Sequence, residues 1–207
     1  MTDINNEQLE GYKIYLKLIH ERMLNKYFEE QSPYLCYQNG CAHCCQKGQY
    51  PMSEIEVKFI LSKMASLEKS LQETILYNIQ SIIKEKNTSK LQREDFFYQC
   101  PFLINSSCSV YENRALICRT HGLMFFIDDN TGNEKYKIPF CVHLGLNYSN
   151  VYDKEQNTIT EELIKKVGAK CPPQAYNLSL RTLTNKKITS ELGFEFGEFK
   201  PLIEWFM

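Results

Sequence analysis

Apolar residues near the start of the chain recur at intervals of three and four, the spacing of one face of an amphipathic α-helix. The pattern predicts a helix over residues 5–29, and Ser32-Pro33 should end it, because the residue before a proline disfavours the α-helical conformation. Such a face is typical of a helix that covers a core, with a partner-binding helix as the alternative. The face consists of Leu9, Tyr12, Leu16, Ile19, Met23 and Tyr27.

The same spacing returns between residues 53 and 86 and predicts a second helical region. Ser53 and Glu56 at its start have the spacing of a capping box. A break near Ala65-Ser66 would divide the region into two antiparallel helices. The polar residues 87–95 that follow predict a surface loop.

Shorter elements are predicted further along the chain. Residues 123–127 and 136–140 read as the two strands of a β-hairpin. Residues 160–167 predict a helix that Gly168 ends, and Pro172 or Pro173 should begin another helix. The aromatic segment 193–207 is expected to dock on the chain's own core, with a self-association or partner surface as the alternative. The predicted fold class is therefore mainly α with a small β-hairpin (α+β), as a compact helical domain around a cysteine-rich site.

The composition suits a globular protein, because hydrophobic residues make up 43% of the 207 residues. We expect one domain over residues 1–207, with an N-terminal helix in 1–33 and a helical and aromatic extension in 151–207. The net charge of -1 gives no footprint for nucleic acid or an anionic membrane. No apolar run approaches the about 18 residues of a membrane span, and the polar N-terminus does not resemble a signal peptide. These features predict a cytoplasmic protein with no membrane or nucleic-acid partner. They leave open a substrate or protein partner and the oligomeric state.

The chemistry of this chain is concentrated in its cysteines. There are nine, an odd number, and in a reducing compartment cysteines are more often metal ligands than disulfides. Four of them lie between residues 36 and 45, together with His43 and a predicted turn at Asn39-Gly40. The alternative is a set of buried or disulfide-bonded cysteines. The predicted metal ligands are Cys36, Cys41, Cys44, Cys45, Cys100, Cys108, Cys118, Cys141 and Cys171.

The cysteines fall into groups that the fold should bring together. Two antiparallel helices between residues 53 and 86 would return the chain, so the groups at 36–45 and 100–118 should meet. In the second group, residues 105–107 predict a turn between two short extended pieces, and residues 111–118 could form two helical turns. Cys141 and His143 would share one face of the hairpin's return strand, which is a weak metal signal.

The thiols favour zinc in a closed structural site or iron in an iron–sulfur cluster. The adjacent pair Cys44-Cys45 favours more than one metal atom per chain, because neighbouring side chains point in different directions. Arg114, Arg119 and Lys47 flank the thiols and could offset their negative charge. His121, three residues after Cys118, is a weak candidate for a general acid or base.

The joint cysteine pattern resembles that of the YkgJ-type cysteine cluster proteins, a family described as a zinc- or iron-chelating domain. The resemblance rests on Cys36-x4-Cys41-x2-Cys44-Cys45, on Cys100-Pro-Phe-Leu, and on Cys108-x-Val-Tyr-Glu-x-Arg-x4-Cys118-Arg119, and covers roughly residues 34–120. The chain departs from the family's usual pattern in its first gap of four residues and in Ala115 after Arg114.

This resemblance implies metal or cluster binding. A related branch, the flagellin lysine methylases, is described as using S-adenosylmethionine. Our leading hypothesis is a metal-binding protein that holds iron, as an iron–sulfur cluster, or zinc, with a redox or catalytic role open. The alternatives are a small protein-modifying enzyme such as a methyltransferase-like member, or a structural zinc adaptor module.

Overall fold

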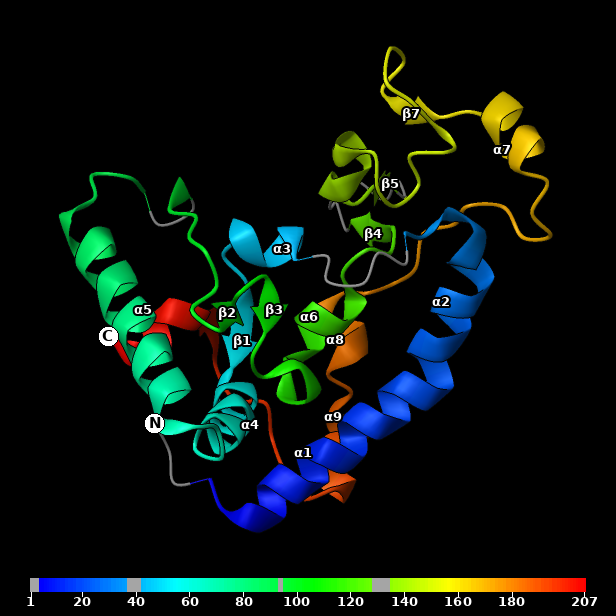
Figure 1. Cartoon of the computed structure of the whole chain (residues 1–207). Helices are drawn as coiled ribbons and strands as arrows, with labels where there is room; N and C mark the ends of the chain where they lie inside the picture. The colour runs from blue at the N-terminus through cyan, green and yellow to red at the C-terminus, as the bar shows by residue number, and fades with distance from the viewer. Residues whose placement is uncertain (1–3, 37–41, 93–94, 128–134) are drawn as a thin grey trace. The chain divides into compact units, whose positions relative to one another are not determined.

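The chain folds as two compact units, each assembled from separate stretches of sequence (Figure 1). The computed structural model describes residues 4–36, 42–92, 95–127 and 135–207. The first unit comprises Met1–Ile14, Asn39–Arg119 and Lys186–Met207, and the second comprises Tyr15–Gln38 and Thr120–Asn185. The predicted class, mainly α with small antiparallel strand pairs, is confirmed. The single domain over residues 1–207 stays a prediction.

The N-terminal helix is confirmed, and it contains a π-helical turn that the sequence pattern did not predict. α1 (Asn6–Ile19) leads into the π turn η1 (His20–Leu24) and then α2 (Asn25–Gln31). The 3₁₀ turn η2 (Ser32–Tyr34) ends the run at the proline, as predicted. A π turn holds one residue more than an α turn, so the buried position moves along by one. Leu24 is consequently buried, whereas the predicted Met23 is only partly so.

The first unit contains the predicted pair of helices and the cysteine-bearing segments. α4 (Glu54–Met64) and α5 (Lys69–Thr88) are separated by a break at residues 65–68, close to the predicted position. The unit's other elements are α3 (His43–Gln46), β1 (Pro51–Ser53), β2 (Leu103–Ile104), β3 (Ser107–Cys108), the 3₁₀ turn η4 (Tyr111–Asn113), α6 (Leu116–Thr120, whose last residue falls in the second unit), α9 (Lys186–Glu191), β8 (Phe199–Pro201) and the 3₁₀ turn η6 (Leu202–Phe206).

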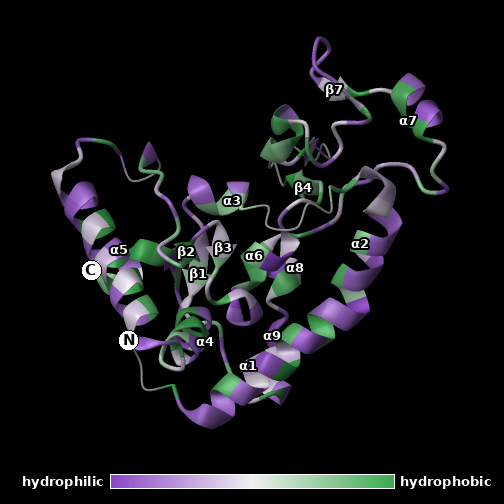
Figure 2. Cartoon of the chain, viewed as in Figure 1, coloured by the Kyte–Doolittle hydropathy of each residue, from purple (hydrophilic) through white to green (hydrophobic). Residues whose placement is uncertain are grey.

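The core of this unit is formed by the apolar faces of α4 and α5 and by the C-terminal segment. Figure 2 shows hydrophobic and hydrophilic residues in alternation along α5, whose Ile75, Ile79 and Ile82 are buried. The C-terminal segment docks here, as predicted: β8 pairs antiparallel with β1, and the indole of Trp205 donates a hydrogen bond of 2.9 Å to the carbonyl of Met52. Leu202, Ile203 and Trp205 join the same buried cluster as the α5 isoleucines.

The second unit contains two short hairpins around an aromatic core. β4 (Phe125–Ile127) pairs with β5 (Lys135–Lys137), which confirms the predicted hairpin, and β6 (Tyr152–Asp153) pairs with β7 (Thr158–Ile159). α7 (Glu161–Val167) ends at Gly168 with φ 64°, as predicted. The core of the unit is formed by Tyr34, Met124, Val142, Tyr148, Val151 and Tyr152.

The prediction of a helix beginning at Pro172 or Pro173 was wrong. The segment is extended, because Tyr176 exchanges backbone hydrogen bonds of 3.0 and 3.1 Å with Met124 and Phe126 on β4. The next helix, α8 (Leu180–Leu183), begins only after Ser179, whose side chain accepts a hydrogen bond from the backbone N–H of Thr182. A strand pairing therefore overrode the local preference of the prolines.

The prediction that Cys141 and His143 share one face of a strand was also wrong. The strand ends at Lys137, and Phe140–Leu144 forms the 3₁₀ turn η5 after Pro139. Residues two apart on a 3₁₀ turn point to different sides, since such a turn has about three residues. The argument for a shared ligand face is therefore lost.

In the described ranges, we find no helix with both the length and the apolar character needed to cross a bilayer.

Gly11 lets α1 approach the backbone of the C-terminal segment. A Cβ atom at this position would lie 2.2 Å from the carbonyl oxygen of Leu192, closer than any real contact. The opposing atom is backbone, so it cannot turn away like a flexible side chain. The glycine is thus required by packing within the first unit.

We expect Gly11→Ala to destabilise the protein by about 1–3 kcal/mol, through overpacking. Without a steric conflict, alanine should stabilise the helix relative to glycine by about 1 kcal/mol. A loss of stability in Gly11→Ala would therefore reveal the steric conflict. Urea unfolding followed by circular dichroism measures the change. Lys13→Ala, an exposed position on the same helix, is the control and should have little effect. A gain in stability for Gly11→Ala would contradict the close approach.

Candidate metal centre

Cys44 and Cys45, the last two cysteines of the first group, lie on α3 and are tied to the segment before Cys100. The backbone N–H of Cys45 donates to the carbonyl of Ala42 at 2.9 Å, and the Tyr50 hydroxyl donates to the carbonyl of Cys44 at 2.9 Å. Just beyond α3, Gly48 and Tyr98 exchange backbone hydrogen bonds of 3.1 and 3.4 Å in an isolated antiparallel bridge. The bridge fixes the loop of the first group against the start of the second.

The end of the first cysteine group meets the start of the second, which confirms the prediction for Cys45 and Cys100. The backbone N–H of Cys100 donates to the carbonyl of Cys45 at 2.7 Å. Within the first unit, α3, β1, β2 and β3 lie near one another in Figure 1, in agreement with these bonds. The return of the chain through α4 and α5 therefore brings together cysteines more than fifty residues apart in sequence.

Cys108 and Cys118 are positioned by two short elements that follow Cys100. Cys108 lies on β3 and pairs with Leu103 on β2. The predicted turn between these strands is present, with Asn105 and Ser106 at φ 50° and 61°. Positive φ at both central residues is typical of the tightest hairpin turns. Cys118 lies on α6, which is shorter than the two helical turns predicted.

The adjacent thiols of Cys44 and Cys45 are close enough to bind the same ion. Their sulfur atoms lie 3.9 Å apart. A tetrahedral ion with metal–sulfur bonds of about 2.3 Å would hold its sulfur ligands about 3.8 Å apart. The observed spacing fits one edge of such a site, so the adjacent pair alone does not require two metal atoms.

Electrostatic interactions connect this pair to the other thiols of the unit. Contact with Cys45 lowers the pKa of the Cys44 thiol to about 7, and the same contact, with burial, raises the pKa of Cys45. Burial raises the pKa of Cys100 to about 12, and the negative charges of Cys108 and Cys44 contribute. Burial likewise raises the pKa of Cys108 and of Cys118, and both interact with Cys44. The group thus consists of mutually interacting thiols that are half-buried.

The donor set fits zinc or iron by its chemistry. Thiolates are soft ligands that select zinc and iron over magnesium or calcium. In the part of the chain that the structure describes, no three His, Cys, Asp or Glu side chains are already arranged to hold a metal ion. Cys44 and Cys45 have ligand spacing, and Cys100, Cys108 and Cys118 lie within electrostatic range of this pair.

The other predicted ligands lie elsewhere. Cys41 is outside the described residues. Cys36, Cys141 and Cys171 belong to the second unit and are half-buried. There, the backbone N–H of Cys36 donates to the Asn147 side chain at 2.7 Å, and the carbonyl of Cys171 accepts from the Tyr34 hydroxyl at 2.7 Å. Their roles as ligands stay predictions.

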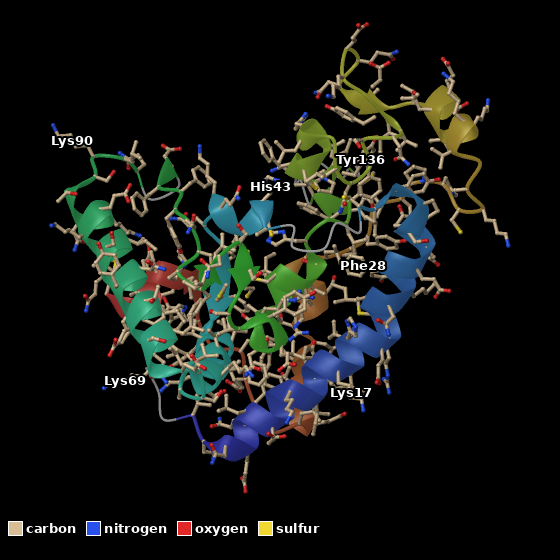
Figure 3. All side chains as sticks on the ribbon, viewed as in Figure 1. Lys17, Phe28, His43, Lys69, Lys90 and Tyr136 are labelled. Carbon is tan, nitrogen blue, oxygen red and sulfur yellow. The ribbon has the colours of Figure 1, made fainter. Side chains whose placement is uncertain are left out.

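The histidines near the cysteines are exposed or lie in the second unit. His43 opens α3 (Figure 3), is exposed, and contacts the Gln46 side chain at 3.1 Å. His143 is exposed and packs edge-on against Phe140 and Tyr152. His121 is half-buried in the second unit, and its acid–base role stays a hypothesis.

The two predicted arginines play different parts. Arg119 donates from Nε to the carbonyl of Arg114 at 3.1 Å and from its terminal nitrogen to the carbonyl of Glu112. It therefore holds the backbone of the turn η4. The guanidinium of Arg114 instead lies 3.8 Å from the centre of the Tyr111 ring. Its positive charge adds to the contact with Cys45 that lowers the pKa of Cys44, and it opposes the burial that raises the pKa of Cys108. Lys47 is exposed.

Glu56 has a role that the capping box revealed only in part. One carboxylate oxygen accepts from the backbone N–H and the hydroxyl of Ser53, both at 2.8 Å, as predicted for the start of α4. The other oxygen accepts from the backbone N–H of Leu116 at 2.8 Å and from the Tyr12 hydroxyl at 3.3 Å. No sequence signal pointed to these two partners, which are 60 and 44 residues away. The fully buried side chain therefore links α1 and α4 to the first residue of α6, the helix that carries Cys118.

Comparison with known families places these cysteines in a shared pattern. The model of the family described as "CxxCxxCC: Putative zinc- or iron-chelating domain" matches residues 35–142, a little over half of the chain. The chain belongs to this family. Its match confirms the suspected resemblance, extends it to include Cys141, and leaves Cys171 outside. The family description names zinc or iron and no reaction. Comparisons with curated proteins and with solved structures found no match.

Removal of the Glu56 carboxylate should destabilise the first unit strongly. Glu56→Ala leaves the backbone N–H groups of Ser53 and Leu116 buried without their acceptor, at a cost of about 1–3 kcal/mol for each group. Glu56→Gln keeps one acceptor oxygen and should lose less. Chemical unfolding measures the free energy of unfolding of both variants and shows which of them loses more. Glu68→Gln, an exposed glutamate of the same unit, is the control. Equal stability of Glu56→Ala and wild type would refute the bridging role.

Proposed function

We propose that the first unit chelates iron or zinc through the thiolates of Cys44, Cys45, Cys100, Cys108 and Cys118. The observation that carries this proposal is the convergence of thiols from α3, β3, α6 and the segment before β2. Cys41, in the same sequence motif as Cys44, is the sixth candidate. The family match supports the binding of zinc or iron. The 3.9 Å between the sulfur atoms of Cys44 and Cys45 supports their binding to the same ion.

We propose further that the occupant is iron in an iron–sulfur cluster, with zinc as its competitor. The support is the number of thiols: a single tetrahedral ion uses four ligands, and this unit supplies five in its described residues alone. An iron–sulfur cluster would supply one-electron chemistry, whereas a closed zinc site would be structural. A redox or catalytic role would follow only from the cluster.

Substitution of a thiol should reduce the bound metal without abolishing the fold. In Cys108→Ser we expect the metal content to fall by at least about half, because the site loses a thiolate. Elemental analysis of anaerobically purified protein, with circular dichroism as a check on folding, measures this.

Val110→Thr provides the matched control for this substitution. Val110 lies two residues from Cys108 and is 2% exposed, so a hydroxyl there disturbs the same region while every cysteine stays in place. The control should keep its metal. If both variants retain wild-type metal content, Cys108 is not a ligand.

The stoichiometry should exceed one metal atom per chain. We expect two or more iron atoms with matching acid-labile sulfide, and a brown protein, because the thiols outnumber the ligands of one tetrahedral ion. Elemental and sulfide analysis after anaerobic purification tests this. A colourless protein with two zinc atoms would show that the site holds structural zinc and no iron–sulfur cluster. One metal atom per folded chain, reproducibly, would contradict both versions.

A further inference from the structure

The hairpin of the second unit leaves one edge of its sheet open. β5 pairs antiparallel with β4 and, in the residues that the structure describes, with no other strand. All three residues of β5, Lys135, Tyr136 and Lys137, are exposed, and Tyr136 is labelled in Figure 3. An edge of this kind presents backbone N–H and C=O groups to which a further strand can bind.

The hydrogen bonds on the far side of β4 determine which residue of β5 faces the open edge. The backbone N–H of Phe126 donates to the carbonyl of Tyr176 at 3.1 Å, so it points away from β5. Phe126 lies opposite Tyr136. In an antiparallel pair only every second pair of opposed residues exchanges hydrogen bonds, and this pair is therefore one that does not. Tyr136 consequently directs its own N–H and C=O away from β4 and toward the open edge.

The side chains give the two faces of this edge different characters. Successive side chains of a strand point to opposite faces, so Tyr136 lies on one face and the two lysines lie on the other. Phe126, opposite Tyr136, shares its face, and the two rings are 38% and 46% exposed. The open edge thus combines a pair of outward backbone groups with an aromatic face and a basic face.

A second copy of this chain is a poor occupant of the edge. Two copies of β5 paired antiparallel about Tyr136 would place Lys135 of each copy opposite Lys137 of the other. Like charges directly opposite one another destabilise a strand pair. Lysines on an edge strand commonly protect it from pairing with another edge, and here that protection is selective, because it acts against basic strands and favours acidic ones.

A nucleic acid or an anionic membrane is also a poor occupant. Residues 123–144, which include the hairpin, contain two lysines and three acidic residues, a net charge of -1 with histidine neutral. A polyanion, which spans more than one strand, would therefore gain no net attraction from this part of the chain. A single extended segment that contacts only β5 meets the lysines without meeting the rest of the hairpin.

We propose that the edge of β5 binds an extended acidic segment of a partner protein, which adds to the sheet as a third strand. The segment carries an apolar residue between two acidic ones. Its backbone exchanges two hydrogen bonds with Tyr136, its acidic side chains lie opposite the lysines, and its apolar side chain packs beside Tyr136 and Phe126. This docking surface belongs to the second unit and does not depend on the metal site of the first.

The test uses short fluorescent peptides, with capped ends, and the full chain. The first peptide has a valine between two glutamates. The second has lysines in place of the glutamates, and the third keeps the glutamates but carries a methyl group on the amide nitrogen of the valine. Fluorescence anisotropy measures the affinity of each peptide for wild type, for Lys137→Glu and for the matched control Lys165→Glu, an exposed lysine on α7 in the same unit. Circular dichroism checks that the variants are folded.

We expect wild type to bind the acidic peptide saturably and the lysine peptide at least about fivefold more weakly. The methylated peptide should bind about tenfold more weakly than the acidic one, because it has lost the N–H that donates to the carbonyl of Tyr136. Lys137→Glu should weaken the acidic peptide about fivefold and strengthen the lysine peptide, since the reversed charge exchanges attraction for repulsion. Lys165→Glu should match wild type.

Three outcomes overturn the inference. The first is a wild-type chain that shows no saturable binding of the acidic peptide. The second is equal affinity for the acidic and the methylated peptide, which would leave a charge attraction without strand addition. The third is a wild-type dimer in sedimentation velocity that the acidic peptide dissociates, because the edge would then be occupied by a second copy.

Discussion

A single buried carboxylate holds together the helices that surround the thiols. Glu56 accepts from Ser53 at the start of α4, from Leu116 at the start of α6, and from the hydroxyl of Tyr12 on α1. Burial raises the pKa of this carboxyl, and the four hydrogen bonds it accepts oppose the rise. Because one side chain accepts from the capping residue of α4 and from the first residue of α6, the orientation of α6 is coupled to that of α4. The position of Cys118 thus depends on a residue outside the cysteine groups.

The local structure of this chain could be predicted from its sequence wherever it depends on residues close together in the chain. The capping box at Ser53, the break after Met64 and the positive φ at Gly168 all follow from residues within a few positions of one another. The approach of Cys45 and Cys100 was also predictable, because a pair of helices between them was expected to return the chain.

Several of the failures occur where distant contacts set the local geometry. Pro172 and Pro173 precede an extended segment because Tyr176 pairs with β4, about fifty residues earlier. The hydrogen bond between the Glu56 carboxylate and the backbone N–H of Leu116 could not be predicted either, because the two residues are far apart in sequence. In the candidate site, spacing identified the thiols but not their separation, and the adjacency of Cys44 and Cys45 was a poor guide to the 3.9 Å between their sulfur atoms. Arg114 and Arg119 looked equivalent in sequence, and only their hydrogen bonds separate them.

The pairing of β8 with β1 has a consequence for the order in which the protein is made. β1 ends at Ser53, the capping residue of α4, and its partner strand β8 lies about 150 residues later. Leu202, Ile203 and Trp205 fill the core against α5, so a growing chain that has not reached residue 205 cannot close the first unit. All nine cysteines are synthesised before that point. Their thiols therefore emerge on an incomplete scaffold, and a chaperone or metal donor that acts during translation would meet them in the open.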